Sequence, residues 1–284
     1  MTRSVRTPLI GVLVAAAGLA LARVLAFDVH ALHHADAVTL HDFMSLDRQS
    51  IYNVITDVAH VADPAPYGLI GALIVGVALA RGRVRVGLAV LAILAGSAVT
   101  TDRILKPLLA APRYDSLLGL RQIADASFPS GHATAAMALA LCAILVASPR
   151  TRPYVAALGA LFAIAVSYSF LVLGWHYPSD VLGGFLVAGA WTSLAVAALR
   201  FADARWPARS GRRAAGRLLA RVHARAVIGT LIALLLVLAI AVAAVAPTRA
   251  FDFVSAHTVF AVGAGAIALA SAAVAGVVAA ILRD

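Results

Sequence analysis

Glutamate is absent from this 284-residue chain, lysine and cysteine each occur once, and charged residues make up only 13% of the sequence. Soluble domains carry about 25% charged residues, so this chain has too few charges to cover a water-exposed surface. A single cysteine excludes a disulfide framework and a cysteine-based metal site. Cys142 lies inside an apolar run and is expected to be a small buried hydrophobe. With hydrophobic residues at 62%, these shortages predict an all-α protein that crosses a membrane several times.

Long apolar runs predict where the membrane-spanning helices lie. A helix needs about 20 predominantly apolar residues to cross a bilayer. Runs that approach this length occupy 8–26, 66–80, 86–104, 131–148, 154–173, 179–199, 226–246 and 259–282. The first run could instead be a cleaved signal peptide, because Arg3 and Arg6 precede a short apolar core. Cleavage would leave the orientation of the later spans unchanged.

The arginines between these runs predict how the chain is oriented. One set of connections, together with both termini, holds 16 of the 23 cations and only two aspartates, Asp203 and Asp284. By the positive-inside rule this side is cytoplasmic. The other, extracytoplasmic side carries the acidic first loop, the loop over 105–130 and the loop around His176. These features predict a multi-pass protein of the cell (plasma) membrane.

A histidine and an aspartate stand four residues apart at the start of the run over 179–199, in His176-Tyr-Pro-Ser-Asp180. A carboxylate one helical turn from an imidazole can fix the orientation of the ring and raise its basicity, as a nucleophile or proton-transfer group requires. Ionisable groups at the edge of a membrane span are functional candidates by default. The alternative is an ordinary interfacial pair that closes a loop.

A cluster of cations occupies the extracytoplasmic loop that precedes this span. Lys106 and Arg113 are seven residues apart, about two helical turns, although Pro107 and Pro112 argue against a continuous helix. Arg103 and Arg121 lie in the same loop. The positive-inside rule disfavours cations on this side, so we expect an anionic ligand. Snorkelling toward lipid headgroups is the alternative.

A third polar cluster, Pro129-Ser-Gly-His132, comes just before the apolar run at 131–148. Ser130 is a plausible N-cap, and Gly131 allows a ligand to approach the backbone closely. The free N–H groups at a helix start bind phosphate readily, and His132 stands where it could transfer a proton. With the two clusters above, these residues predict a phosphate site that has a nucleophile and an acid.

The three clusters together resemble the type 2 phosphatidic acid phosphatase superfamily, the membrane lipid phosphate phosphatases. The family pattern is Lys-x6-Arg-Pro, then Pro-Ser-Gly-His, then Ser-Arg-x5-His-x3-Asp, and nine of its eleven positions match here, at 106–113, 129–132 and 169–180. The resemblance implies a six-helix core and metal-independent hydrolysis without a cofactor. It makes His176 the nucleophile that forms a phosphohistidine, oriented by Asp180. His132 would protonate the leaving oxygen and then activate water.

The same resemblance implies that phosphate is held by Lys106, Arg113, Ser130 and the Gly131 N–H. Two positions depart from the pattern: Tyr114 replaces a proline, and Phe170 replaces the arginine of the third motif. Removing one donor to transition-state charge typically costs ~10²–10³ in rate. We therefore expect Arg121 or Arg103 to supply the missing charge. A weakened or repurposed site is the competing interpretation.

The rest of the chain adds less specific expectations. The His- and Asp-rich first loop is expected to form interfacial amphipathic helices, with a metal site as the less favoured alternative. We divide the chain into a six-span core over 1–200, a basic cytoplasmic connector over 201–225 and a two-helix extension over 226–284. The connector is expected to lie on anionic lipid rather than nucleic acid. A small-residue ladder in the last helix could serve a homodimer, a partner or the core of the bundle.

The expected function is therefore hydrolysis of a lipid phosphate or diphosphate on the extracytoplasmic face. A polyprenyl (di)phosphate or a glycerophospholipid phosphate is the expected substrate. Two alternatives stay open. One is a phosphotransferase that passes the phosphoryl group to a second lipid or sugar. The other, motivated by Phe170, is a non-catalytic lipid-phosphate binder or transporter.

Overall fold

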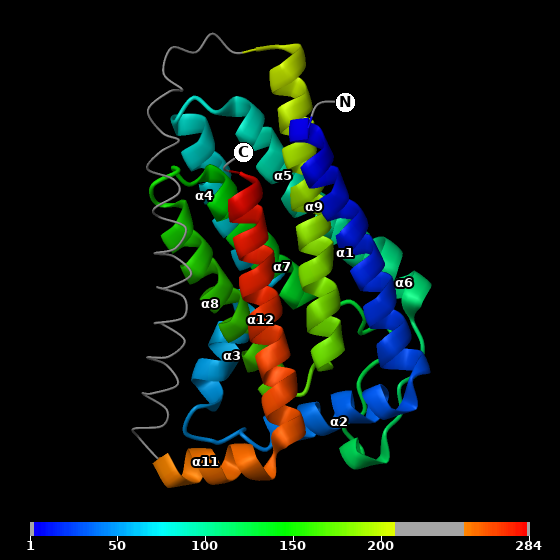
Figure 1. The fold of residues 1–284 in the computed structure, drawn as a ribbon. Helices are drawn as coiled ribbons and strands as arrows, with labels where there is room; N and C mark the ends of the chain where they lie inside the picture. The colour runs from blue at the N-terminus through cyan, green and yellow to red at the C-terminus, as the bar shows by residue number, and fades with distance from the viewer. Residues whose placement is uncertain (1–2, 208–246, 283–284) are drawn as a thin grey trace.

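The computed structural model describes residues 3–207 and 247–282, and Figure 1 shows their arrangement as a bundle of upright helices with shorter ones across one end. The long helices are α1 (Arg3–Asp28), α4 (Pro64–Ala80), α5 (Val84–Val99), α7 (Gly131–Val146), α8 (Arg152–Val172), α9 (Pro178–Arg205) and α12 (Thr258–Ile281). The shorter helices are α2 (His30–Met44), α3 (Tyr52–His60), the π-helix η1 (Thr100–Leu105), α6 (Lys106–Leu109), the 3-10 turn η2 (Ser116–Leu118) and α11 (Pro247–Ala256).

The described helices confirm the all-α, multi-pass membrane architecture. Five of them are long and apolar enough to span a bilayer, and α3 with α4, bent by 55°, adds a sixth if the pair is one span. Helix α7 is apolar but shorter. The span that begins at Val84 runs through η1 and α6 to Leu109, five residues beyond the predicted end. The predicted span at 226–246 and most of the basic connector fall outside the described residues.

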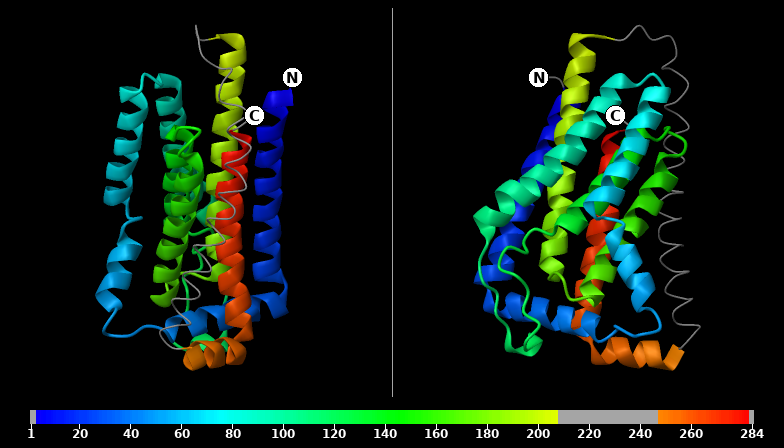
Figure 2. Two further views of the ribbon diagram at one scale, coloured as in Figure 1. Left: turned by 60° about the vertical axis from the view of Figure 1, so that its left-hand side comes forward. Right: turned by 180° about the vertical axis from the view of Figure 1, so that it is seen from behind.

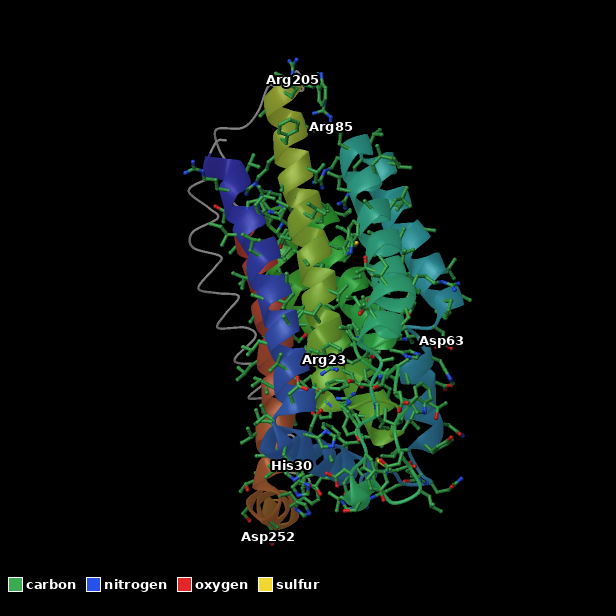
Figure 3. All side chains as sticks on the ribbon, turned by 90° about the vertical axis from the view of Figure 1, so that its right-hand side faces the viewer. Arg23, His30, Asp63, Arg85, Arg205 and Asp252 are labelled. Carbon is green, nitrogen blue, oxygen red and sulfur yellow. The ribbon has the colours of Figure 1, made fainter. Side chains whose placement is uncertain are left out.

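The two ends of the bundle differ in charge. In Figure 3, Arg85 and Arg205 lie at one end, whereas His30 and Asp252 lie at the other. Helices α2 and α11 lie across this second end, and both described chain ends are at the first (Figures 1 and 2). The arginine-rich connections within the described residues, which include Arg85 and Arg205, therefore share one end, as the charge pattern predicts. The first loop, expected to form interfacial helices, contains α2 and α3.

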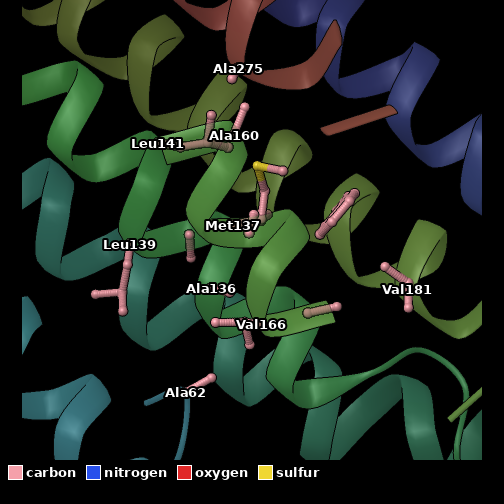
Figure 4. Packing of buried hydrophobic residues seen from close by; sticks show 14 of the residues in the cluster. Ala62, Ala136, Met137, Leu139, Leu141, Ala160, Val166, Val181 and Ala275 are labelled. Carbon is pink, nitrogen blue, oxygen red and sulfur yellow. The ribbon is translucent and has the colours of Figure 1, made fainter. Parts of the chain in front are cut away.

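Helix α7 lies at the centre of the core. Most of its side chains are buried, and it packs against α4, α5, α8 and α9. Small residues allow this close packing: a Cβ on Gly184 of α9 would stand 2.7 Å from the carbonyl oxygen of Ser130. Figure 4 shows Ala136, Met137 and Leu141 of α7 among neighbouring core side chains. This packing fixes the starts of α7 and α9 against each other.

Helix α12 extends the bundle beyond the six-helix core and packs on α8, α9 and α2. The Tyr168 hydroxyl donates to the carbonyl of Ala264 at 2.7 Å, and the Ser271 hydroxyl donates to that of Ala160 at 3.0 Å. Both bonds join α12 to α8. The described part of the extension is therefore an integral part of the bundle.

Candidate active site at the start of two helices

A tight turn between α8 and α9 positions His176. Gly174 adopts φ +71°, a conformation that favours glycine. The backbone N–H groups of Gly174 and Trp175 donate to the carbonyls of Leu171 and Phe170, both at 3.0 Å, which is the hydrogen-bond pattern of a Schellman motif. The chain then reverses, and α9 begins at Pro178, a residue well suited to the first helical position. His176 is thereby fixed between two helix ends.

Asp180 contacts the Nδ1 side of the His176 ring. Its carboxylate is fully buried and lies 3.3 Å from His176 Nδ1, and it also accepts the Tyr177 backbone N–H at 3.0 Å. When Nδ1 carries the proton that faces this carboxylate, Nε2 keeps its lone pair. That is the form of histidine that can attack phosphorus. The predicted His176–Asp180 contact is thus present in the fold.

Arg113 anchors the same carboxylate from the loop that follows α6. Its guanidinium forms an ion pair with Asp180 and donates to the Ser179 hydroxyl at 2.9 Å and the Ser127 hydroxyl at 2.8 Å. The guanidinium carbon lies 4.3 Å from the centre of the Phe27 ring and 4.1 Å from that of Tyr177. Arg113 therefore lies behind His176, and its expected contact with phosphate stays a prediction.

Asp36 of α2 joins this network, although the residue pattern gave no sign of it. Its carboxylate accepts the Ser179 backbone N–H at 3.0 Å and the Ser179 hydroxyl at 2.5 Å, and it lies 3.5 Å from Arg113. It thus caps α9, where negative charge is favoured. Burial raises the pKa of Asp36 to about 6, although Arg113 and Ser179 act in the opposite direction.

The start of α7 lies beside Lys106. The buried Ser130 side chain accepts the Ala133 N–H at 3.3 Å, which confirms the predicted N-cap. A Cβ on Gly131 would stand 3.3 Å from Lys106 Nζ and 3.2 Å from an Asp102 oxygen. Lys106 and Asp102 form an ion pair at 2.9 Å, one turn apart along η1 and α6. Gly131 thus leaves room for Lys106 and Asp102 at the start of α7. A phosphate bound there would compete with Asp102 for Lys106.

His132 lies on the first turn of α7, facing His176. The two ring centroids are 6.2 Å apart, and the ring planes make an angle of 64°. His132 Nε2 lies 3.0 Å from Asp63 Oδ1, at the junction of α3 and α4; Figure 3 labels Asp63 at this bend. The two predicted catalytic histidines therefore come together, and each has a carboxylate partner.

Aromatic rings surround the two histidines. Phe170, fully buried at the position of the motif arginine, has its ring centroid 5.8 Å from that of His132 and 5.4 Å from that of His176. Trp175 lies 5.4 Å from His132 and 5.6 Å from His60. The departure at Phe170 therefore replaces a cation with an apolar contact between the catalytic candidates.

The other sequence candidates are less firmly placed. Arg103 and Arg121 are both exposed, so their role as compensating cations stays a hypothesis. Sequence reasoning missed three acids, Asp36, Asp63 and Asp102; the signal that could have found them is the concentration of aspartates on the side that carries the motifs. Within the part of the chain that the structure describes, no three His, Cys or Asp residues are placed to hold a metal ion.

Comparisons of the sequence with known proteins find one matching family model and two similar curated proteins. Residues 85–204 match the model of the PAP2 superfamily. The chain is 41% identical over 69 residues to the undecaprenyl-diphosphatase of Sulfolobus acidocaldarius and 38% identical over 65 residues to undecaprenyl-diphosphatase BcrC of Bacillus subtilis. These matches cover 24% and 23% of this chain and 31% of each relative, so the chain spans about a third of the length of these curated relatives.

A solved structure is also similar. It is that of a transmembrane PAP2-type phosphatidylglycerolphosphate phosphatase from Bacillus subtilis. The alignment covers 74% of this chain and 100% of that chain, at 22% identity and a TM-score of 0.49.

Proposed function

Because residues 85–204 match the model of the PAP2 superfamily, we propose that this protein hydrolyses a lipid phosphate or diphosphate through a phosphohistidine on His176. The observation that carries the proposal is the pairing of His176 Nδ1 with the buried Asp180 while His132 stands across from it. This pairing supports a nucleophile on one side of a phosphate and a proton donor on the other.

The reaction has two steps in this proposal. In the first, Nε2 of His176 bonds to phosphorus as the bond from phosphorus to the leaving oxygen breaks, and protonated His132 gives its proton to that oxygen. A lipid alcohol leaves when the substrate is a monophosphate, and a lipid monophosphate leaves when it is a diphosphate. In the second, His132 takes a proton from water, whose oxygen bonds to phosphorus while the P–N bond breaks. Inorganic phosphate leaves, and both histidines return to their starting states.

Charge stabilisation in this site depends on few cations. Phosphoryl transfer relies on positioning and on neutralising the charge of the transferred group. Lys106 beside Gly131 is the cation best placed to do so, with Ser130, the Gly131 N–H and Arg113 as the further phosphate-binding residues. Two cations, Lys106 and Arg113, face four carboxylates in contact with the site, Asp36, Asp63, Asp102 and Asp180. Burial lowers the pKa of His132, whereas Asp63 acts in the opposite direction. A bound phosphate adds further negative charge, so we expect His132 to be protonated in the complex with substrate.

The substrate is proposed to be an amphiphile whose phosphate lies at headgroup depth. The two curated relatives are named for undecaprenyl diphosphate, which makes a polyprenyl (di)phosphate the first candidate. A glycerophospholipid phosphate, which the resemblance of the motifs implies, is the second. The arginine-rich connections at the opposite end support an extracytoplasmic site with both termini in the cytoplasm.

Phosphate release from a panel of lipid phosphates tests this proposal. Purified wild-type protein, assayed with EDTA present, should release inorganic phosphate from at least one polyprenyl or glycerophospholipid phosphate. His176→Ala should abolish the release, and Arg48→Ala, an exposed change distant in sequence from the motifs, should not. Equal release by wild type and His176→Ala would rule the mechanism out.

A non-catalytic lipid-phosphate binder is the second candidate, favoured by Phe170 and by the ion pairs that already engage both cations. The same panel distinguishes it: such a protein would bind a lipid phosphate without releasing phosphate. A phosphotransferase would instead deliver the phosphoryl group to an added lipid or sugar acceptor.

A further inference from the structure

We propose that Asp63 is a positioning residue for His132, so that the site contains a second histidine–carboxylate pair built like His176–Asp180. This inference rests on the proposed function. Asp63 lies outside the three motifs and outside the residues that match the family model. Its carboxylate oxygen is 3.0 Å from His132 Nε2, across 69 residues of sequence.

The local sequence leaves the Asp63 carboxylate available for this contact. Asp63 is the N-cap of α4, a position whose side chain normally accepts the backbone N–H of the second or third helical residue. Helix α4 begins Pro64-Ala-Pro66, and Pro66, the third helical residue, has no N–H. The Asp63 side chain makes no cap hydrogen bond. The Asp63 carboxylate thus lies at the start of a helix that offers it few backbone N–H donors. It contacts His132 rather than the backbone of α4.

The two pairs share one design. In each, one ring nitrogen contacts a carboxylate, Nδ1 in His176 and Nε2 in His132, and the other nitrogen is left for the reaction. They differ in exposure, since Asp180 is fully buried whereas the Asp63 side chain is 38% exposed. Asp63 therefore acts as an accessible partner that orients the acid and favours its protonated form.

Several other groups surround His132. Those that affect its charge disfavour the protonated ring, and Asp63 acts against them. Burial disfavours the charged ring, and His176 and Lys106 add positive charge on the same side. Phe170 and Trp175 contact the ring without offering charge. Asp63 is the carboxylate that pairs with the ring. Removing its charge should therefore shift the titration of His132 to lower pH.

Titration of His132 in wild type and Asp63→Asn tests the proposal without requiring turnover. The variant keeps the size of the side chain and its N-cap capacity. By nuclear magnetic resonance of the purified protein, the His132 ring should titrate about one pH unit lower in Asp63→Asn. Asp57→Asn, an exposed change on the neighbouring α3, should leave it unchanged. An unchanged His132 titration in Asp63→Asn would overturn the proposal.

Kinetics provide the second measurement. At neutral pH, Asp63→Asn should lower kcat about tenfold, as expected when an acid that supplies 10²–10⁴-fold loses part of its orientation and protonation. The limb of the kcat profile that reports loss of the acid should move to lower pH, and Asp63→Glu should restore part of the rate. If His132 titrates as expected but wild type hydrolyses no lipid phosphate, the pairing stands and the proposed function fails. A kcat profile that does not change in Asp63→Asn would contradict a positioning role.

Discussion

At the scale of single residues, the site is defined by how few charges it contains and how they are paired. Arg113 joins Asp180 to Asp36, and Lys106 is paired with Asp102. Phe170 removes the cation that the motif would supply. We therefore expect each ion pair to affect either how firmly His176 is held or how much positive charge remains for phosphate.

Arg113 should contribute to stability as well as to activity. Arg113→Ala would leave Asp180 and Asp36 buried without their cation, and breaking a buried pair in this way typically costs about 3–5 kcal/mol. We expect a marked drop in the thermal unfolding temperature in detergent, together with loss of phosphate release. Arg48→Ala, an exposed arginine, serves as the control. Unfolding of Arg113→Ala at the wild-type temperature would show that the network is not stabilising.

Asp102 should restrain Lys106. The two form an ion pair at 2.9 Å beside Gly131, where phosphate is expected to bind. Asp102→Asn would leave Lys106 to interact with phosphate alone, so we expect KM for a lipid phosphate to fall severalfold. Asp47→Asn, an exposed change in the first loop, is the matched control. A higher KM in Asp102→Asn would mean that the carboxylate instead holds Lys106 in its working position.

Asp36 should make stability depend on pH in a defined direction. Burial raises the pKa of Asp36 to about 6 in the folded chain, above its ordinary value of 3.8. Because the pKa is raised, protonated Asp36 stabilises the folded state. This stabilisation is fully present below pH 3.8 and is lost as the pH rises through about 6. The difference corresponds to on the order of 3 kcal/mol. Lowering the pH from 8 to 5 should therefore raise the unfolding temperature of wild type more than that of Asp36→Asn. Equal shifts would contradict this assignment.

At the scale of helices, the site depends on where α7 and α9 begin relative to each other. The Ser130 backbone N–H donates to the carbonyl of Asp180 at 2.9 Å, which ties the two helix starts together. Gly184 permits that contact because it has no Cβ. The lengthened span through η1 brings Lys106 to the same place, and π-helical segments are often found at functional sites.

Gly184→Ala tests this packing. Its Cβ would lie 2.7 Å from the Ser130 carbonyl oxygen and 2.8 Å from the Thr134 nitrogen, both backbone atoms. Overpacking of this kind typically costs about 1–3 kcal/mol, so the unfolding temperature and phosphate release should both fall. Gly76→Ala on α4 meets nothing within 4 Å and serves as the control. A wild-type unfolding temperature and wild-type phosphate release in Gly184→Ala would show that the site does not depend on this contact between α7 and α9.

The positions of most described helices could be predicted from the sequence. Apolar run length sets the described spans, and the Ser130 cap follows from local chemistry. The partners of Asp36 and Asp63 could not be predicted, because they lie 143 and 69 residues away and depend on how α2 and α4 pack. The position of Arg113 behind His176 was missed for a related reason: the motif gives its spacing, and the fold decides which anion it meets.

At the scale of the whole molecule, the bundle has an arginine-rich end and a site-bearing end. In the described residues, Asp63 and the starts of α7 and α9 lie toward the end covered by α2, whereas Arg85 and Arg205 lie at the other (Figures 1 and 3). We therefore expect a substrate phosphate to approach from one side of the membrane only. The charge pattern predicts that this is the extracytoplasmic side.

Cysteine labelling tests that orientation. In a Cys142→Ser background, exposed Leu120 of the site end and exposed Trp206 of the arginine end can each be replaced by cysteine. A membrane-impermeant maleimide should label Leu120→Cys in intact cells and Trp206→Cys only after the membrane is opened. Cys142 is the single cysteine of the sequence, so this background carries no thiol other than the introduced one. The reverse pattern would place the site in the cytoplasm.

The central claim is that His176 carries the phosphoryl group, and trapping that intermediate tests it most directly. Wild-type protein mixed with a radiolabelled lipid phosphate and quenched rapidly in alkali should carry label on the peptide that contains His176. The label should be lost in acid, absent from His176→Ala, and increased in His132→Ala if the second step slows more than the first. Phosphate release without any label on His176, under conditions where the intermediate should accumulate, would contradict the account.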